Sequence, residues 1–174
     1  ASVIAARHAG AGKIIVTGLA ADKNKLALAK AFGADHTIDV ENENAIERVK
    51  ELTGWRGADV VVEVTSYATQ PVREALEYVR AGGTIVLAGV KGFRPIPDFI
   101  SDLIVLKEIS IKGAIGVTSS ADRKAISLIE SRAVPIEKMH THDFALEEAD
   151  LAIRTLARQV PGEESIHSCL IPPA

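Results

Sequence analysis

Residues Gly57 to Lys91 read GADVVVEVTSYATQPVREALEYVRAGGTIVLAGVK. Ala58 to Val64 is a short, Val-rich run after a glycine, which predicts a strand buried on both faces of a parallel sheet. The next segment predicts an amphipathic helix that Ala81-Gly82-Gly83 ends, and Thr84 to Ala88 predicts a second buried strand. These elements form a βαβ unit, whose crossover is expected to be right-handed.

Two short loops follow the strands of this unit. Thr65 and Ser66 come directly after the first strand, and Gly89 and Val90 come after the second. The carboxyl ends of parallel strands meet at one edge of a sheet, and open α/β sheets bind ligands at that edge. We therefore expect a binding site where these two loops meet.

Strands and helices alternate on both sides of this unit. Ala1 to His8 reads as the end of a helix, and Asp22 is the expected N-cap of a later one. Further strands or extended segments are expected at Lys13 to Thr17, His36 to Val40, Ile109 to Ala114, Thr141 to Phe144 and Ile166 to Ile171, and further helices at Lys23 to Phe32, Glu43 to Leu52, Asp102 to Lys107, Ser120 to Arg132 and Leu146 to Ala157. This order predicts an α/β fold with a doubly wound parallel sheet, Rossmann-like and truncated before its first strand.

Composition narrows the class of protein. The 174 residues are 47% hydrophobic and 25% charged, which is typical of a globular domain. The net charge of −3 and the lack of a basic block argue against nucleic acid or a membrane as partner. Cys169 is the only cysteine, so an internal disulfide and a multi-cysteine zinc site are excluded. With no secretory signal visible, we expect a reducing, cytoplasmic location.

Gly10-Ala11-Gly12 resembles the start of a dinucleotide-binding fingerprint, but its context differs. The fingerprint follows a strand and opens a helix, so that helix amides meet the pyrophosphate. Here the glycines follow a predicted helix and open a strand, and no third glycine falls in place. If this is a dinucleotide-binding domain, its phosphate loop is expected before Ala1.

Paired acids and histidines give no further site. Asp59 and Glu63 lie on one face of a predicted strand, but their spacing separates them by roughly 13 Å, too far for a catalytic dyad. We expect structural roles for both. His140 and His142 could place two imidazoles on one side of a strand, but no thiol and no third ligand accompany them in the sequence. We therefore predict no metal site in this chain.

Several runs together resemble a known family. These are KIIVTG, KLALAKAFGADHTIDV, ELTGWRGADVVVEVTS, ALEYVRAGGTIVLAGV and ISIKGAIG. They are similar to the cofactor-binding domain of medium-chain, zinc-type alcohol dehydrogenases, with polyol and threonine dehydrogenases the nearest in character. The similarity covers almost the whole chain, with the motifs in the family's order.

The resemblance implies a set of residues that bind a nicotinamide cofactor. The implied set follows the ends of the predicted strands: Thr17, Gly18, Lys25, Val64, Thr65, Ser66, Ala88, Gly89, Val90, Ala114, Ile115 and Gly116. Thr17, Gly18 and Lys25 match the adenosine ribose contacts. Residues 64–66 match the loop beside the adenine and the nicotinamide ribose, and residues 88–90 and 114–116 match backbone contacts to the nicotinamide end. His167 stands where many members carry an arginine that faces the pyrophosphate.

The resemblance also implies what the chain lacks. In the family, the catalytic zinc ligands and the proton relay lie in an N-terminal domain, so we expect no catalytic residue here and no activity of the chain alone. The cofactor is expected to be NAD or NADP, because Gly18 replaces the acidic residue of NAD-specific members. The implied substrate is a small alcohol or polyol. Residues 1–145 would form the nucleotide-binding domain, and residues 146–174 a helix and strand returning toward the catalytic domain.

Two other functions remain open. RAGGTIVLAG also resembles part of a SAM-dependent methyltransferase fold, although the terminal antiparallel hairpin of that fold is not visible here. A non-catalytic nucleotide-sensing module is the second alternative.

Two expectations concern unpaired strand edges. Ile109 to Ala114 is expected at a sheet edge, where it would pair across the axis of a homodimer or tetramer. In the Rossmann order 3-2-1-4-5-6, the strand at Lys13 to Thr17 would be the second and that at Ala58 to Val64 the fourth. The slot between them would be closed by a neighbouring chain, by an upstream segment, or by direct pairing of the two strands.

Overall fold

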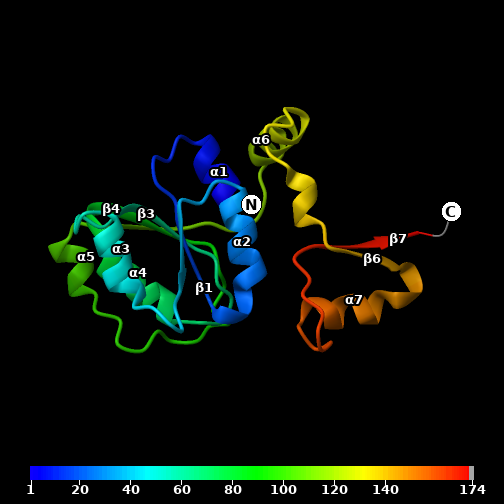
Figure 1. Ribbon diagram of the computed structural model, residues 1–174. Helices are drawn as coiled ribbons and strands as arrows, with labels where there is room; N and C mark the ends of the chain where they lie inside the picture. Colours follow the sequence, from blue (N-terminus) through cyan, green and yellow to red (C-terminus); the bar gives the residue numbers. More distant parts are fainter. Residues whose placement is uncertain (173–174) are drawn as a thin grey trace.

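The computed structural model describes residues 1–172, and it is an α/β fold, as the sequence predicts. The α-helices are α1 (Ser2–His8), α2 (Lys23–Ala31), α3 (Ala45–Leu52), α4 (Gln70–Tyr78), α5 (Asp102–Leu106), α6 (Ser119–Glu130) and α7 (Ala149–Leu156) (Figure 1). The strands are β1 (Ile15–Gly18), β2 (His36–Asp39), β3 (Ala58–Glu63), β4 (Val79–Leu87), β5 (Ser110–Gly113), β6 (His142–Ala145) and β7 (Ser168–Ile171). Short 3-10 turns occur at Ala20–Asp22, Ile136–Met139 and Leu146–Glu148.

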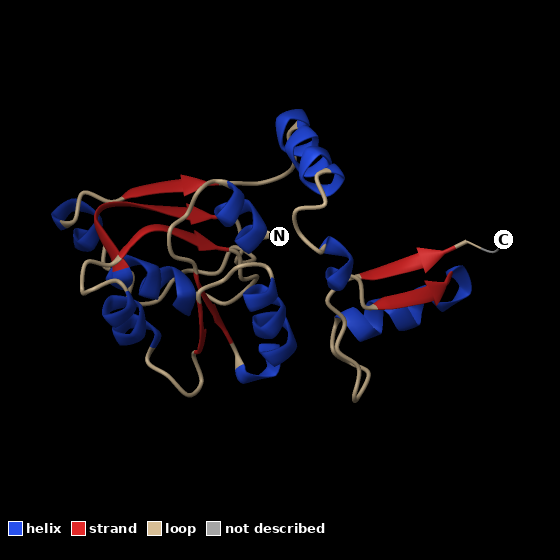
Figure 2. Ribbon diagram, turned by 45° about the horizontal axis from the view of Figure 1, so that its top comes forward, coloured by secondary structure: helices blue, strands red, loops and turns tan. Residues whose placement is uncertain are grey.

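All strand pairs in the described residues are parallel. Three strands form one sheet in the order β3-β4-β5, and β1-β2 and β6-β7 form two separate pairs (Figure 2). Because parallel neighbours need a crossover between them, the helices that follow β1, β3 and β4 are a consequence of this pairing. The parallel α/β architecture is therefore confirmed.

The main core lies between the strands and one layer of helices. α3 and α4 each place an apolar stripe against the sheets, and Val49, Ala75 and Leu76 are all buried there. Ile38 of β2 and Ile85 of β4 belong to the same cluster and are 0% and 1% exposed. Burial of a side chain of this size stabilises the fold by about 1.5–3 kcal/mol.

β3 does not have the environment predicted for it. Val60 and Val62 are 57% and 50% exposed, whereas Val61 and Glu63 are buried. The expectation of a strand buried on both faces is therefore wrong in this structure. Alternate residues of a strand point to opposite faces, and α3 and α4 cover only one of them.

The end of α4 also differs from the prediction. The helix ends at Tyr78, and Ala81-Gly82-Gly83 lies within β4 and does not terminate a helix. The Gly82 amide donates to the carbonyl of Lys107 at 2.7 Å. A Cβ on Gly83 would lie 2.6 Å from Val79 Cγ2, so glycine lets the chain bend back tightly where β4 begins.

The slot in the sheet is not closed by direct pairing. In residues 1–172, β1 pairs only with β2 and β3 pairs only with β4. The expectation of direct closure is therefore wrong, and this chain does not form one continuous six-stranded sheet by itself. The strand pairs that are present, β2-β1 and β3-β4-β5, match the two outer parts of the Rossmann strand order, on either side of its central strand. A strand from a neighbouring chain or an upstream segment stays a prediction.

The segment from β6 onward forms a unit of its own. α7 packs against β6 and β7, and this unit lies beside α2 (Figure 1). Arg158 pairs with Asp22, and Asn24 donates to Glu164, so two polar contacts join the unit to α2. The expected domain boundary between residues 145 and 146 falls between β6 and β7, which pair with each other. This boundary stays a prediction. The last two residues of the expected segment 146–174 lie outside the described part of the chain. Among the described residues, no helix has the length and apolar character required to cross a membrane.

Candidate functional site

Three loops meet at the carboxyl edge of the β3-β4-β5 sheet. They are residues 64–66 after β3, 88–90 after β4 and 114–116 after β5. The Ala88 amide donates to the carbonyl of Glu63 at 2.8 Å, and the Ala114 amide donates to that of Leu87 at 2.9 Å. The Tyr67 amide donates to the carbonyl of Val90 at 3.0 Å. The structure therefore brings nine of the sequence-predicted residues together.

A buried ion pair fixes two of these loops. The Glu63 side chain is 3% exposed, and its Oε2 lies 2.7 Å from Lys91 Nζ. Oε1 accepts from the Thr65 amide at 2.8 Å and from the Thr65 hydroxyl, and Lys91 Nζ also donates to the Thr65 carbonyl. A buried carboxylate costs several kcal/mol unless it is paired and hydrogen-bonded, and here both conditions are met.

Lys91 was missed as a functional residue by the sequence analysis. The signal that could have found it is the acidic residue Glu63 inside a Val-rich strand, since a buried carboxylate requires a cation. The only basic residue in the loop after β4, up to Gly92, is Lys91. Glu63 therefore has a defined structural role: its carboxylate accepts hydrogen bonds from Thr65 and holds that loop in place.

Gly89 is required where the loops touch. A Cβ built on Gly89 would lie 2.1 Å from the carbonyl oxygen of Thr65. No side chain fits at that distance, so the two backbones approach as closely as they do only because residue 89 has no side chain. Val64, Val90 and Ile115 stand around this contact and are all more than half exposed. The edge therefore offers backbone groups surrounded by apolar side chains.

The remaining predicted residues lie at the end of β1. Thr17 and Gly18 pair with Ile38 and Asp39 of β2, and a Cβ on Gly18 would lie 3.0 Å from Leu26 Cδ2. A side chain at position 18 would thus crowd Leu26, and no carboxylate is present at this position. Within the described residues, no backbone hydrogen bond joins this strand end to the three loops, so both groups lie at strand ends without being bonded to each other.

Lys25 and Asp22 lie just after this strand end. Lys25 is exposed, with Nζ 3.7 Å from Asp22 Oδ1. Asp22 precedes α2, but its carboxylate does not cap the helix; it accepts from the Leu19 amide and pairs with Arg158. Burial alone would raise the pKa of Asp22, but the hydrogen bonds from Arg158 and Leu19 outweigh it, and the pKa is lowered. Asp22 therefore stands at the predicted N-cap position of α2, but its side chain makes no capping hydrogen bond there.

Surface hollows of the described residues lie at the opposite end of the strands. The first is lined by Arg56, Asp59, Arg80 and Ala81, and the second extends from there toward Lys107. Asp59 Oδ1 accepts from Arg80 Nε at 2.6 Å, and this bond is the main cause of the lowered pKa of Asp59. The charged groups that line these hollows are bonded to one another, whereas ligands of open α/β sheets bind at the carboxyl edge.

A family comparison fits this geometry. The model of the zinc-binding dehydrogenase family matches residues 1–131. The chain belongs to this family. A Mycobacterium tuberculosis protein named as an alcohol dehydrogenase is 39% identical over 170 residues, which are 97% of this chain and 46% of that protein. The chain thus spans about half the length of the curated relatives it matches.

Solved structures show the same fold. An alcohol dehydrogenase of Thermotoga maritima is 28% identical with a TM-score of 0.86, and the match covers 98% of this chain and 46% of that one. A zinc-binding dehydrogenase structure from Sinorhizobium meliloti, bound to NADP, is 28% identical with a TM-score of 0.80 over 94% of this chain and 46% of that one. The methyltransferase alternative is not favoured by these comparisons.

Proposed function

We propose that this chain binds the nicotinamide cofactor in an alcohol dehydrogenase, which transfers a hydride between an alcohol and NAD or NADP. The observation that carries the proposal is the junction of three loops at the carboxyl edge, two of which are held together by Glu63, Lys91 and Thr65. Family membership supports it. The cofactor itself supplies the hydride chemistry, and the chain supplies binding and orientation.

The twelve residues at the strand ends would hold the cofactor in three groups. Thr17, Gly18 and Lys25 would lie at the adenosine ribose, where Lys25 is exposed and offers an ammonium group. Residues 64–66 would lie beside the adenine and the nicotinamide ribose, with residues 88–90 and 114–116 at the nicotinamide end. Two features of this structure support the fit of a cofactor here. Gly89 lets the backbone of its loop contact the backbone at Thr65, and a Cβ at Gly116 would meet no atom within 4 Å.

The steps of the reaction that take place at the alcohol would be carried out by another part of the protein. Zinc and the proton relay belong to the catalytic domain of the family, and we expect residues 1–145 without that domain to bind cofactor and to catalyse no reaction. Residues 146–174 would return toward the catalytic domain. A small alcohol or polyol is the proposed substrate.

The cofactor preference is proposed from Gly18. An acidic residue at this strand end would bind the ribose hydroxyls of NAD and repel the 2′-phosphate of NADP, and Gly18 does neither. The NADP-bound Sinorhizobium structure supports the use of NADP in the family. We expect weak discrimination between the two cofactors.

Steady-state kinetics of the full-length protein tests this proposal. A panel of primary alcohols and polyols is assayed with NAD and with NADP, and calorimetry with S-adenosylmethionine is run in parallel. Turnover with both cofactors is expected, with kcat/KM values within about a hundredfold, a difference of about 2.7 kcal/mol. A larger preference for NAD contradicts the role of Gly18. Binding of the methyl donor without dehydrogenase activity contradicts the function itself.

The assembly and location are proposed on similar grounds. β5 is an edge strand in the described residues, since it pairs only with β4, and Ile111 is 37% exposed. An unpaired edge of this kind is stabilised by pairing with a second copy, so we propose a homodimer or a tetramer built from such dimers. The single free thiol of Cys169 is in keeping with a reducing, cytoplasmic environment.

A further inference from the structure

Three metal-binding side chains converge beside β6 and β7. They are His140, just before β6, and His167 and Cys169 at the start of β7, and one donor atom from each lies within 4.8 Å of the others. The sequence analysis predicted no metal site because it found no thiol and no third ligand beside His140 and His142. His142 is not one of the three donors, since its Nε2 lies 3.1 Å from Glu163 Oε2. The missing thiol and the second imidazole come instead from a segment about 27 residues later in the chain.

The spacing of the two imidazoles is that of two ligands on one ion. Nδ1 of His140 lies 3.3 Å from Nδ1 of His167. Two nitrogens at about 2.0–2.1 Å from a tetrahedral zinc lie about 3.3–3.4 Å apart. The rings meet edge to face, with centroids 5.6 Å apart at an interplanar angle of 64°. The two Nδ1 atoms therefore face each other, and the rings do not stack.

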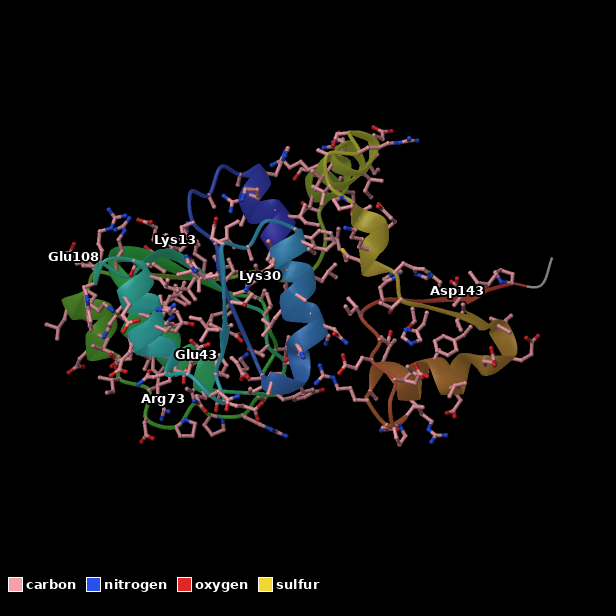
Figure 3. The ribbon with its side chains drawn as sticks, in the orientation of Figure 1. Lys13, Lys30, Glu43, Arg73, Glu108 and Asp143 are labelled. Carbon is pink, nitrogen blue, oxygen red and sulfur yellow. The ribbon has the colours of Figure 1, made fainter. Side chains whose placement is uncertain are left out.

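A carboxylate orients the first of these imidazoles. Asp143 lies on β6, in the C-terminal unit (Figure 3), and its Oδ1 lies 2.9 Å from His140 Nε2. A carboxylate on the far nitrogen of a histidine fixes the tautomer, with the proton on Nε2 and the lone pair on Nδ1. The lone pair of His140 is then available at the nitrogen that faces His167.

The backbone holds the second and third donors in place. β6 and β7 pair in parallel with Asp143 opposite Cys169, so the carboxylate and the thiol belong to adjacent strands in register. The Thr141 amide and hydroxyl both donate to the carbonyl of His167, each at 3.0 Å. His167 and Cys169 are two residues apart and thus project from the same face of the strand.

We propose that His140, His167 and Cys169 bind one divalent ion of borderline-soft character, with Zn²⁺ the best match. Two imidazoles and a thiolate are zinc ligands, and three protein ligands leave a fourth position for water or a further ligand. Binding releases the thiol proton of Cys169 to solvent, and the Nδ1 proton of His167 moves to Nε2, so that both imidazoles bind as neutral ligands. The site differs from the cysteine-rich kind that the single cysteine excludes, and it is separate from the nine residues at the carboxyl edge of the β3-β4-β5 sheet.

Metal content of the full-length protein tests this site by difference. Wild type, Cys169→Ser and His140→Gln are loaded with Zn²⁺, dialysed and assayed for zinc per chain; His8→Gln, an exposed histidine at the end of α1, is the control. Wild type and the control are expected to hold one more zinc per chain than the two ligand variants. Any zinc in another domain is common to all four proteins and cancels. Equal zinc in all four proteins overturns the proposal.

Cobalt and the orienting carboxylate give a second, independent readout. Co²⁺ loading is expected to give a thiolate-to-metal charge-transfer absorption in wild type that Cys169→Ser lacks. Asp143→Asn is expected to keep this absorption and to weaken metal binding about 10–100-fold, the usual effect of losing such a partner. Absence of the thiolate band in wild type overturns the proposal. The proposal is also overturned if His167→Gln loses cofactor affinity but keeps the extra zinc. Circular dichroism of each variant establishes that it is folded.

Discussion

Lys91 Nζ lies 2.7 Å from Glu63 Oε2, and both side chains are largely buried at the carboxyl edge of the sheet. The pair connects the end of β3 with the loop after β4, and Thr65 is bonded to both partners. Two loops that belong to different strands are thus fixed relative to each other before any ligand arrives. Such preorganisation lowers the entropic cost of binding.

Removal of the cation is expected to destabilise this edge strongly. Lys91→Met leaves the Glu63 carboxylate buried without a partner, which costs about 3–5 kcal/mol. Native-state hydrogen exchange of the β3 and β4 amides in the full-length protein measures this as a lower free energy of local opening. Lys124→Met, on the exposed α6, is the control and is expected to have no effect at these amides.

The double variant separates the charge from the packing. Glu63→Gln with Lys91→Met removes both charges, so the loss of local stability is expected to be smaller than for Lys91→Met alone. If Lys91→Met changes the opening free energy by less than about 0.5 kcal/mol, the pair does not hold the loops.

Gly89→Ala is expected to weaken cofactor binding while the rest of the fold remains. The added methyl would lie 2.1 Å from the Thr65 carbonyl, so the loops at residues 64–66 and 88–90 must separate. Fluorescence titration with NADH and NADPH measures the loss, expected to exceed tenfold, or about 1.4 kcal/mol. Gly113→Ala is the matched control, since a Cβ there meets no atom within 4 Å. Equal affinities for the two variants would speak against the close contact at Gly89.

The contact between Asp22 and Arg158 is expected to depend on pH. The pKa of Asp22 lies below its ordinary value of 3.8, so the carboxylate stabilises the fold above that value. The stabilisation is lost as the pH falls through the lowered pKa of the folded state. Asp22→Asn should therefore loosen the C-terminal unit by about 1 kcal/mol at pH 7 and have a smaller effect at pH 2.

Hydrogen exchange in α7 and β7 of wild type and Asp22→Asn, measured at both pH values, examines this dependence. Asp150→Asn is a suitable control, because Asp150 is 87% exposed and lies 4.0 Å from Arg154. An effect of Asp22→Asn that is the same at pH 2 and pH 7 would exclude an ionic contribution.

Disruption of the β5 edge is expected to lower the assembly state. Ile111→Lys places a charge on the edge strand, and charges on an edge oppose strand pairing between copies. Light scattering of the full-length protein should give a dimer or tetramer for wild type and a smaller species for Ile111→Lys. Lys112→Glu, at the neighbouring exposed position, tests whether any charge change in β5 has this effect. A wild type that is monomeric at high concentration rules out the interface.

The elements of the fold could be predicted from sequence because their patterns are local. The helix over Gln70–Tyr78 and the strands before and after it follow from apolar spacing and glycines that lie within a few residues. The environment of β3 could not be predicted in this way, because Val60, Val61 and Val62 are the same residue type and only Val61 is buried. Which face of a strand is covered depends on where α3 and α4 pack, and this is a long-range property.

Long-range pairs were also beyond the sequence analysis. Glu63 and Lys91 are 28 residues apart, and His140 and His167 are 27 apart, so no local spacing reveals either pair. The strand ends, in contrast, were predictable at residues 64–66, 88–90 and 114–116, because parallel strands place their carboxyl ends at one edge.

The most direct measurement is the footprint of the cofactor on the full-length protein by hydrogen exchange, with and without saturating NADH or NADPH. Protection is expected at residues 64–66, 88–90 and 114–116, with little change at the hollow lined by Arg56, Asp59 and Arg80. Protection confined to that hollow, or none at the three loops while cofactor is bound, would contradict a cofactor site at the carboxyl edge of this sheet.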